Sequence, residues 1–147
     1  MKAFTISSMR KIHLAEILDI EKASFTTPWS VNSFLSEIFN PFSISLVALN
    51  GESVAGYICA FRVMDEGHIL NLAIREDVRR CGIARALIRC ALEELSLWGC
   101  SSVYLEVRAS NNAARRLYEG LGFIEAGIRK GYYISPVEDA VIMQLQF

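Results

Sequence analysis

Apolar and polar residues follow one another along this chain in blocks that predict both helices and strands. In four blocks the apolar residues recur at helical spacing, and shorter apolar or alternating runs typical of strands separate them. The predicted helices cover residues 10–23, 31–39, 83–98 and 111–121. The predicted strands cover residues 4–7, 43–49, 54–64, 68–74, 102–107, 124–134 and 140–146. The expected element order is therefore β-α-α-β-β-β-α-β-α-β-β.

Turn and capping residues support these boundaries. Ser30 is expected to cap the second helix, because a serine hydroxyl accepts a hydrogen bond from the first helical turn. Asn50-Gly51 is a strong signal for a hairpin between two strands. Gly99 and Gly122 are expected to end the third and fourth helices, and Ser135-Pro136 to turn the chain before the last strand.

Only the central strand–helix–strand unit, at residues 68–107, requires a parallel crossover, because hairpins account for most other connections. The predicted fold class is α/β, with a mixed, mostly antiparallel sheet and helices on both faces. Ligands of such sheets favour the carboxyl ends of the parallel strands. We expect residues 1–147 to form a single domain, since no repeat, low-complexity segment or linker interrupts them.

A turn before the third helix combines glycine with arginines. Arg79-Arg80-Cys81-Gly82-Ile83-Ala84-Arg85 follows an apolar run and opens an amphipathic helical pattern. The first N–H groups of a helix lack partners within the helix and carry the positive end of its dipole, so they bind anions. The turn predicts a site for a phosphorylated ligand, and a solvated basic surface is the alternative. Its sequence is neither a Walker A loop nor the G-x-G-x-x-G fingerprint.

Charge and cysteine content narrow the classes of partner. The net charge of −1 gives no general attraction to nucleic acid or to anionic membranes, so we expect neither as a partner. The chain shows no signal-peptide pattern and no apolar run near the ~18 residues of a membrane span, which predicts a cytoplasmic protein. The four cysteines lack C-x-x-C spacing and a nearby histidine cluster, so we expect reduced thiols and no metal site.

Several segments, taken in order, resemble the GNAT superfamily of N-acetyltransferases. The stretch from Asn71 to Ile88 is similar to the acetyl-CoA-binding signature of that family, and the predicted element order matches its fold. Other segments resemble the RimI-type branch, whose members acetylate the N-terminal alanine of a small-subunit ribosomal protein. These segments are residues 28–30, 105–111, 114, 117–119, 121–123, 129–133 and 138–140. Gly131 departs from that branch, in which asparagine is common at this position.

The resemblance implies an N-α-acetyltransferase that uses acetyl-CoA as co-substrate and a protein N-terminus, that of a ribosomal protein, as acceptor. The amine would attack the thioester directly, without a covalent acyl-enzyme. A small-molecule amine acetyltransferase of the same fold is one alternative, and a non-catalytic acetyl-CoA-binding regulatory module is another. The presence of both candidate catalytic residues, Glu106 and Tyr118, argues against the regulatory module. We expect a monomer or a weak dimer.

Acetyl transfer to an amine needs a neutral amine, a donor for the developing oxyanion and a proton for the leaving thiolate. Glu106 alternates with apolar neighbours on a strand and is the candidate base, acting through water. The alternative for Glu106 is an ion pair with Arg108 or Arg62, or a position on an edge strand. Tyr118 is the candidate acid, and its alternative is ordinary core packing on an apolar helical stripe.

The resemblance also implies the residues that bind the two substrates. The expected contacts with acetyl-CoA are Leu72, Ala73, Ile74, Arg79, Arg80, Cys81, Gly82, Ile83, Ala84, Arg85 and Asn111. Asn111 is also a candidate helix cap, and Leu72 and Ile74 would contribute backbone groups. The expected acceptor groove consists of Phe25, Trp29, Tyr132 and Tyr133. The two tyrosines are expected on alternate faces of a strand end, and core packing or one-sided packing is the alternative. Bound acetyl-CoA should shield Cys81 from alkylation.

Overall fold

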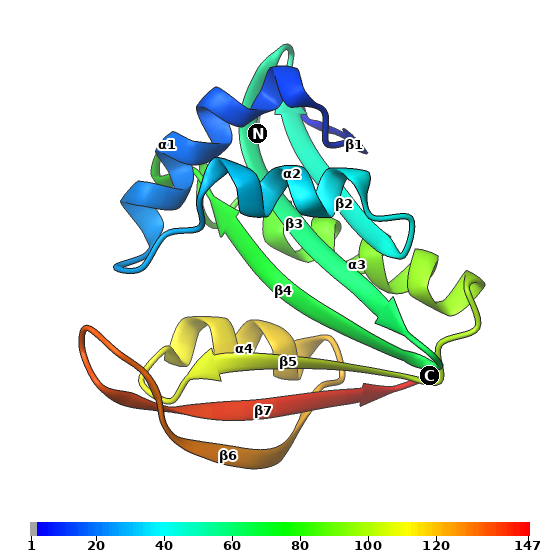
Figure 1. The fold of residues 1–147 in the computed structure, drawn as a ribbon, viewed down its shortest axis with the longest axis vertical. Helices are drawn as coiled ribbons and strands as arrows, with labels where there is room; N and C mark the ends of the chain where they lie inside the picture. Colours follow the sequence, from blue (N-terminus) through cyan, green and yellow to red (C-terminus); the bar gives the residue numbers. More distant parts are fainter. Residues whose placement is uncertain (1–2) are drawn as a thin grey trace.

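The computed structural model describes residues 3–147, whose strands all belong to one seven-stranded sheet (Figure 1). The strand order is β1-β2-β3-β4-β5-β7-β6. The strands are β1 (Thr5–Ser8), β2 (Ser43–Asn50), β3 (Ser53–Val63), β4 (Glu66–Ile74), β5 (Ser102–Arg108), β6 (Ile124–Tyr133) and β7 (Glu138–Gln146). Neighbouring strands are antiparallel except β4 and β5, which are parallel. The predicted fold class is therefore confirmed.

The α-helices are α1 (Leu14–Ser24), α2 (Val31–Phe39), α3 (Ile83–Leu97) and α4 (Asn112–Gly120), with 3₁₀ turns at Lys11–His13 and Glu76–Val78. Their order along the chain is the predicted one. The start predicted for the first helix, residue 10, is wrong because residues 11–13 form a separate 3₁₀ turn. In this turn the Arg10 N–H donates to His13 Nδ1 at 3.0 Å.

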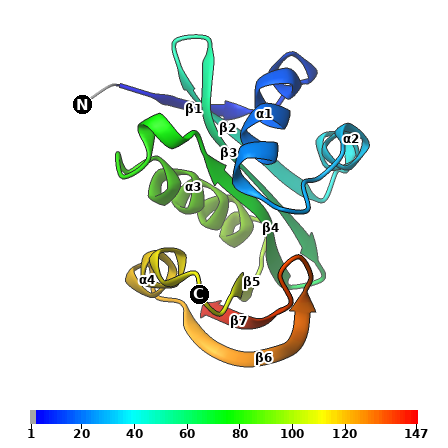
Figure 2. The ribbon, with the colours of Figure 1, turned by 90° about the vertical axis from the view of Figure 1, so that its left-hand side faces the viewer.

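Helices cover both faces of the sheet, as Figure 2 shows for α1 and α2 on one side and α3 on the other. Phe34 and Ile17 pack with Tyr57 in the cluster beneath α1 and α2. Leu87 and Leu95 of α3 are fully buried in the opposite cluster, which continues to α4. Burying a leucine side chain contributes about 1.5–3 kcal/mol, so the apolar stripe of α3 fixes this helix against the sheet.

The two parallel strands separate soon after they meet. Residues 66–68 of β4 pair with residues 102–104 of β5, and beyond these three pairs the strands diverge (Figure 1). At Gly67, an added Cβ would lie 2.7 Å from Leu95 Cδ1, so glycine allows α3 to approach the strands closely at this junction. The divergence leaves the facing edges of both strands without a strand partner.

Candidate active site

A cleft of about 1840 Å³ opens where β4 and β5 diverge. Every site residue predicted from the sequence lines this cleft except Cys81. The lining includes Phe25, Trp29, Leu72, Ala73, Ile74, Arg79, Arg80, Gly82, Ile83, Ala84, Arg85, Glu106, Asn111, Tyr118, Tyr132 and Tyr133. The fold therefore brings together residues that lie up to about 100 positions apart in the chain.

The N-terminus of α3 presents backbone donors to this cleft. Gly82 precedes the helix with φ 82° and ψ 6°, and no side chain caps the first turn. An added Cβ at Gly82 would meet nothing within 4 Å, so the left-handed conformation, not lack of space, favours glycine here. The uncapped N–H groups at the start of α3 fit an anion, because they lack partners and carry the positive end of the helix dipole.

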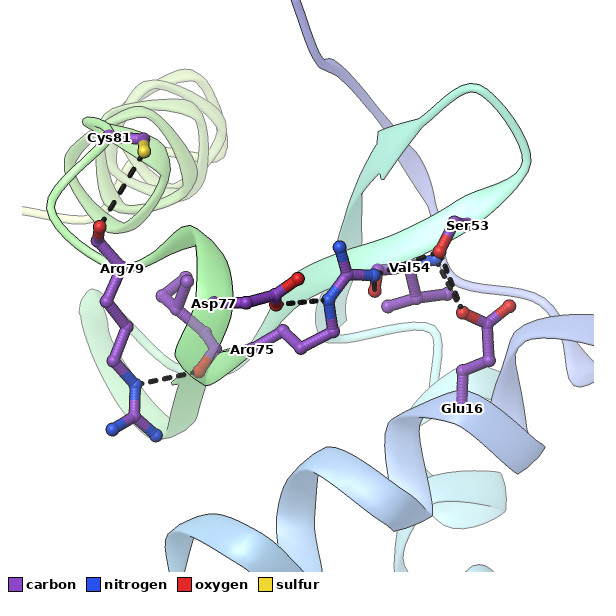
Figure 3. A network of polar contacts seen from close by, with 8 residues as sticks. Glu16, Ser53, Val54, Arg75, Asp77, Arg79 and Cys81 are labelled. Carbon is purple, nitrogen blue, oxygen red and sulfur yellow. Dashed lines mark hydrogen bonds and ion pairs between the residues drawn. The ribbon is translucent and has the colours of Figure 1, made fainter. Parts of the chain in front are cut away.

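The arginines near this turn divide into two groups, of which the first, Arg75 and Arg79, forms hydrogen bonds within the protein (Figure 3). Arg75 donates to Asp77 Oδ1 at 2.6 Å, to Ser53 Oγ at 2.9 Å and to Val54 O at 3.0 Å, so it ties the turn after β4 to β3. Arg79 Nε donates to the Ile74 carbonyl at 3.1 Å. The side chains of Arg80 and Arg85 form no hydrogen bond or ion pair with residues 3–147. Both guanidinium groups are therefore available to a ligand.

The Cys81 thiol lies at the same turn and donates to the Arg79 carbonyl, with an Sγ–O distance of 3.6 Å. It is half-buried against the apolar cluster beneath α3 and does not line the cleft. The expected contact between Cys81 and acetyl-CoA stays a prediction.

Glu106 alternates with buried residues on β5, as the sequence predicted. Its side chain is 28% exposed, and Oε1 lies 3.8 Å from Arg129 Nε. Its other oxygen, Oε2, is buried and has no hydrogen-bond partner within the described part of the chain. This unpartnered oxygen is suited to accept a proton from a ligand or water in the cleft.

The ion pairs considered for Glu106 from the sequence are wrong, because both arginines have other partners. Arg108 donates to the Pro136 and Ile134 carbonyls and to Glu138, and it lies over the Tyr133 ring. Arg62 lies between the Phe42 and Trp98 rings and donates to the Trp98 carbonyl. Arg129 on β6 is the cation that neighbours Glu106 instead.

Tyr118 packs in the core and also lines the cleft, so it fits both roles considered from the sequence, core residue and candidate acid. It is 8% exposed on α4, and its ring packs edge-on against Phe123 with centroids 5.8 Å apart. It also lines the cleft, and its hydroxyl has no hydrogen-bond partner among the described residues. Burial raises the pKa of Tyr118 well above its usual value, so the phenol is protonated at neutral pH and can donate a proton.

Asn111 caps α4, because its Oδ1 accepts a hydrogen bond from the Ala114 N–H at 3.2 Å. The expected cap is confirmed. Its side-chain amide nitrogen is a donor that the cap does not use, and the residue lines the cleft.

Tyr132 and Tyr133, near the end of β6, pack on one side, which was the alternative to the expected alternate faces. Their ring centroids are 5.1 Å apart, and both side chains line the cleft. Gly131 between the strand residues has φ 60°, and the register with β7 shifts between Arg129 and Tyr133, which breaks the alternation. Burial, and then contact with the Glu106 carboxylate, raise the pKa of Tyr132. Burial, and then the charge of Glu106, raise the pKa of Tyr133 to about 12.

Sequence reasoning missed a buried carboxylate, Glu21, that also lines the cleft. It is 1% exposed and accepts hydrogen bonds from the Tyr57 hydroxyl, the Asn71 amide and the Trp29 N–H. One signal was available in the sequence. Glu21 lies four residues after Ile17 and therefore falls on the apolar face of its helix, where a charged residue needs partners.

Two further properties describe the chain as a whole. No group of three or more His, Cys, Asp or Glu side chains within residues 3–147 is arranged to hold a metal ion. In the same part of the chain, no helix has both the length and the apolar character needed to cross a membrane.

Comparison with known proteins gives a consistent set of relatives. The model of the GNAT acetyltransferase family matches residues 14–123. The [ribosomal protein bS18]-alanine N-acetyltransferase of Escherichia coli K12 is 39% identical over 143 residues, which is 96% of each chain. The protein of the same name from Haemophilus influenzae is 31% identical over 141 residues, covering 94% of this chain and 95% of the relative.

Solved structures agree with these relatives. The crystal structure of the ribosomal-protein-S18-alanine N-acetyltransferase from Escherichia coli has a TM-score of 0.90 at 37% identity, covering 98% of this chain and 94% of that one. Arabidopsis thaliana NAA60 in complex with acetyl-CoA has a TM-score of 0.89 at 22% identity, covering 99% and 100%, and shares the fold. This chain therefore belongs to the GNAT family of acetyltransferases and is an acetyl-CoA-dependent N-acetyltransferase.

Proposed function

We propose that this protein transfers the acetyl group of acetyl-CoA to the α-amine of a protein N-terminus, and that its acceptor is the N-terminal alanine of ribosomal protein bS18. One observation carries the reaction. A single cleft is lined by an uncapped helix N-terminus, an unpartnered carboxylate oxygen and a protonated phenol. The names of the relatives that align with nearly the whole chain support the choice of acceptor.

The residues of the α3 wall fit the donor substrate. The uncapped N–H groups of residues 83–85, with Arg80 and Arg85, would bind the pyrophosphate of acetyl-CoA. The unpaired edge of β4 offers backbone groups near Leu72 to the pantetheine arm. Arg79 Nε donates a hydrogen bond to the Ile74 carbonyl. If a donor group of acetyl-CoA took this carbonyl as its acceptor, the Arg79 guanidinium would be released and could approach the phosphates.

Glu106 would remove a proton from the acceptor, through a water molecule. A protein α-amine has a pKa of about 8, so its deprotonation at pH 7 costs about 1.4 kcal/mol, against about 4.6 kcal/mol for a lysine with a pKa of about 10.4. A single carboxylate is therefore a sufficient base for an N-terminus. The neutral amine then attacks the acetyl carbonyl carbon directly, and backbone N–H groups on the β4 edge are the candidate donors to the developing oxyanion.

Tyr118 would complete the transfer. As the new C–N bond forms and the C–S bond breaks, the phenol gives its proton to the departing thiolate. The second amine proton leaves through water, and the phenolate regains a proton from solvent, so the products are an amide and free coenzyme A. The raised pKa of Tyr118 keeps the phenol in the donating form before each turnover.

The test offers the purified protein acetyl-CoA and a peptide that begins with the N-terminal sequence of bS18. Thiol release and the product mass are measured, and the same peptide with a formylated α-amine serves as control. We expect one acetyl group on the α-amine and no reaction of the blocked peptide. Turnover of small amines with none of the peptide would assign the small-molecule alternative. Binding of acetyl-CoA without turnover of any amine would assign the regulatory module.

A further inference from the structure

Glu21 holds both ends of the segment from Phe25 to Trp29, which connects α1 to α2. Its backbone carbonyl accepts the Phe25 N–H at 3.0 Å, and its side-chain Oε2 accepts the Trp29 N–H at 2.9 Å. Phe25 and Trp29 both line the cleft. One residue of α1 therefore determines where this loop enters and where it leaves the rim of the site.

The other carboxylate oxygen binds Glu21 to the sheet. Glu21 Oε1 accepts the Tyr57 hydroxyl of β3 at 2.5 Å and the Asn71 amide of β4 at 2.9 Å. Burial and this hydrogen bond to Glu21 raise the pKa of Tyr57, so the phenol remains a donor. The loop is thus connected through one side chain to the strand that forms a wall of the cleft.

A bulge in β4 places Asn71 where it can reach Glu21. The β3–β4 register shifts between the pairs Ala60–Ile69 and Cys59–Asn71, so Leu70 is the extra residue. Ile69 packs in the cluster beneath α3, whereas Ala73 packs in the cluster beneath α1 and α2. Without the extra residue these alternate positions would share one face. The bulge therefore turns Asn71 toward α1.

Aromatic contacts close the network into a ring. The Trp29 and Phe34 ring centroids are 5.1 Å apart, and the Phe34 and Tyr57 centroids are 5.6 Å apart at 90°. The Tyr57 hydroxyl returns to Glu21. Both the backbone and the ring of Trp29 are consequently held by groups that contact Tyr57.

The chemistry of the partners explains why this position carries a carboxylate. The Tyr57 hydroxyl, the Asn71 amide nitrogen and the Trp29 backbone N–H are all donors, and the two oxygens of a carboxylate accept all three bonds. Apolar residues of similar volume can stabilise a buried site as well as an ionic group does. Stability alone therefore does not require a carboxylate at position 21. A defined position of the loop does require a group that accepts all three hydrogen bonds.

We propose that Glu21 is a positioning residue for the acceptor: it fixes the loop of residues 25–29, so that Phe25 and Trp29 form the peptide-binding rim of the cleft. The inference rests on the proposed function in that the acceptor is a peptide. Glu21 does not contact the reacting atoms. Its effect is on peptide binding, while acetyl-CoA binds at the α3 wall and is unaffected.

The test compares Glu21→Gln with Glu16→Gln. A glutamine at position 21 keeps the shape, and its single side-chain oxygen retains the Tyr57 and Asn71 bonds when it takes the place of Oε1. Its amide nitrogen then faces the Trp29 N–H, so the Trp29 bond is lost. Glu16 lies on the same helix and also accepts a backbone N–H, that of Val54 at 2.9 Å (Figure 3). It does not line the cleft. Steady-state kinetics are measured with peptide and acetyl-CoA varied in turn, and amide hydrogen exchange is followed at Trp29.

For Glu21→Gln we expect the peptide KM to rise about tenfold, the acetyl-CoA KM to change less than about twofold, and Trp29 exchange to accelerate. Glu16→Gln should change none of these. A parallel rise of both KM values would show a general structural role and overturn the inference. Faster Trp29 exchange with an unchanged peptide KM would also overturn it. If the wild-type protein acetylates no peptide, the proposed function fails, and unchanged Trp29 exchange in Glu21→Gln would separately overturn the anchoring role.

Discussion

Replacing Glu106 with glutamine tests the base without changing the shape of the site. Glu106 Oε2 has no hydrogen-bond partner among the described residues, and Oε1 lies 3.8 Å from Arg129 Nε. The substitution therefore breaks no short hydrogen bond, and the free energy of unfolding should change by less than about 1 kcal/mol. Because the fold is preserved, a large loss of turnover in this variant would reflect the loss of proton transfer.

The expected loss of kcat/KM follows from the pKa of the acceptor. General bases contribute about 10²–10⁴-fold, and an α-amine with a pKa of about 8 places a modest demand on the base. We expect a loss of about a hundredfold at pH 7. The neutral fraction of the amine rises from about one-tenth at pH 7 to about nine-tenths at pH 9, so the deficit should shrink to about tenfold at pH 9.

The assay follows thiol release with the bS18 peptide from pH 6.5 to 9.5, for the wild-type protein, Glu106→Gln and a control variant. Glu125→Gln is the matched control, because Glu125 forms an ion pair with Arg115 outside the cleft. Its profile should follow that of the wild-type protein. Full activity of Glu106→Gln at pH 7, or a deficit of equal size at pH 7 and pH 9, would refute the assignment of Glu106 as the base.

Four other outcomes are expected. Tyr118→Phe should lower kcat about a hundredfold at pH 7 while acetyl-CoA still binds, as single-turnover kinetics and calorimetry can check. Because burial raises the pKa of Tyr118, the unfolded chain loses this proton near pH 10 while the folded protein keeps it. The free energy of unfolding should therefore fall above pH 10 by up to about 1.4 kcal/mol per pH unit from this residue, and urea titrations of Tyr118→Phe should lack that contribution. Acetyl-CoA should slow iodoacetamide labelling of Cys81 but not of half-buried Cys90, and equal slowing of both would contradict a local effect. Gly82→Ala and Gly99→Ala both place alanine at positive φ with open space around it, at opposite ends of α3, and each should cost about 1–2 kcal/mol of stability. Only Gly82→Ala should weaken acetyl-CoA binding in calorimetry.

Local patterns predicted the elements well because local interactions determine them. Ser30 accepts a hydrogen bond from the Ser33 N–H at 3.2 Å, as its position before a helical pattern indicated. Gly51 and Gly99 have φ of 63° and 88°, where the hairpin and the helix end were expected. The turn between β4 and α3 was also predictable, because its strand, glycine and helix are consecutive in the chain.

Contacts between distant segments were not predictable in the same way. The side-chain partners of Glu21 lie 8, 36 and 50 residues away, and the bulge at Leu70 decides which face Asn71 takes. Gly131 likewise brings the two tyrosine rings together against the strand pattern. Apolar spacing indicates which face of a regular strand is buried, but it does not reveal the position of a bulge, beyond which the two faces exchange.

The seam between β4 and β5 also has a mechanical consequence. Three residue pairs join the two strands, whereas both strands are paired along most of their lengths on their other sides. The sheet therefore consists of two parts, β1-β2-β3-β4 and β5-β7-β6, that are joined by the three pairs between β4 and β5. The cleft lies between these two parts, so a change in the angle between them would alter the width of the cleft while the ladders within each part stay intact. We therefore expect a larger side chain at Gly67, where an added Cβ would lie 2.7 Å from Leu95 Cδ1, to alter the width of the cleft from the paired end of the β4–β5 seam.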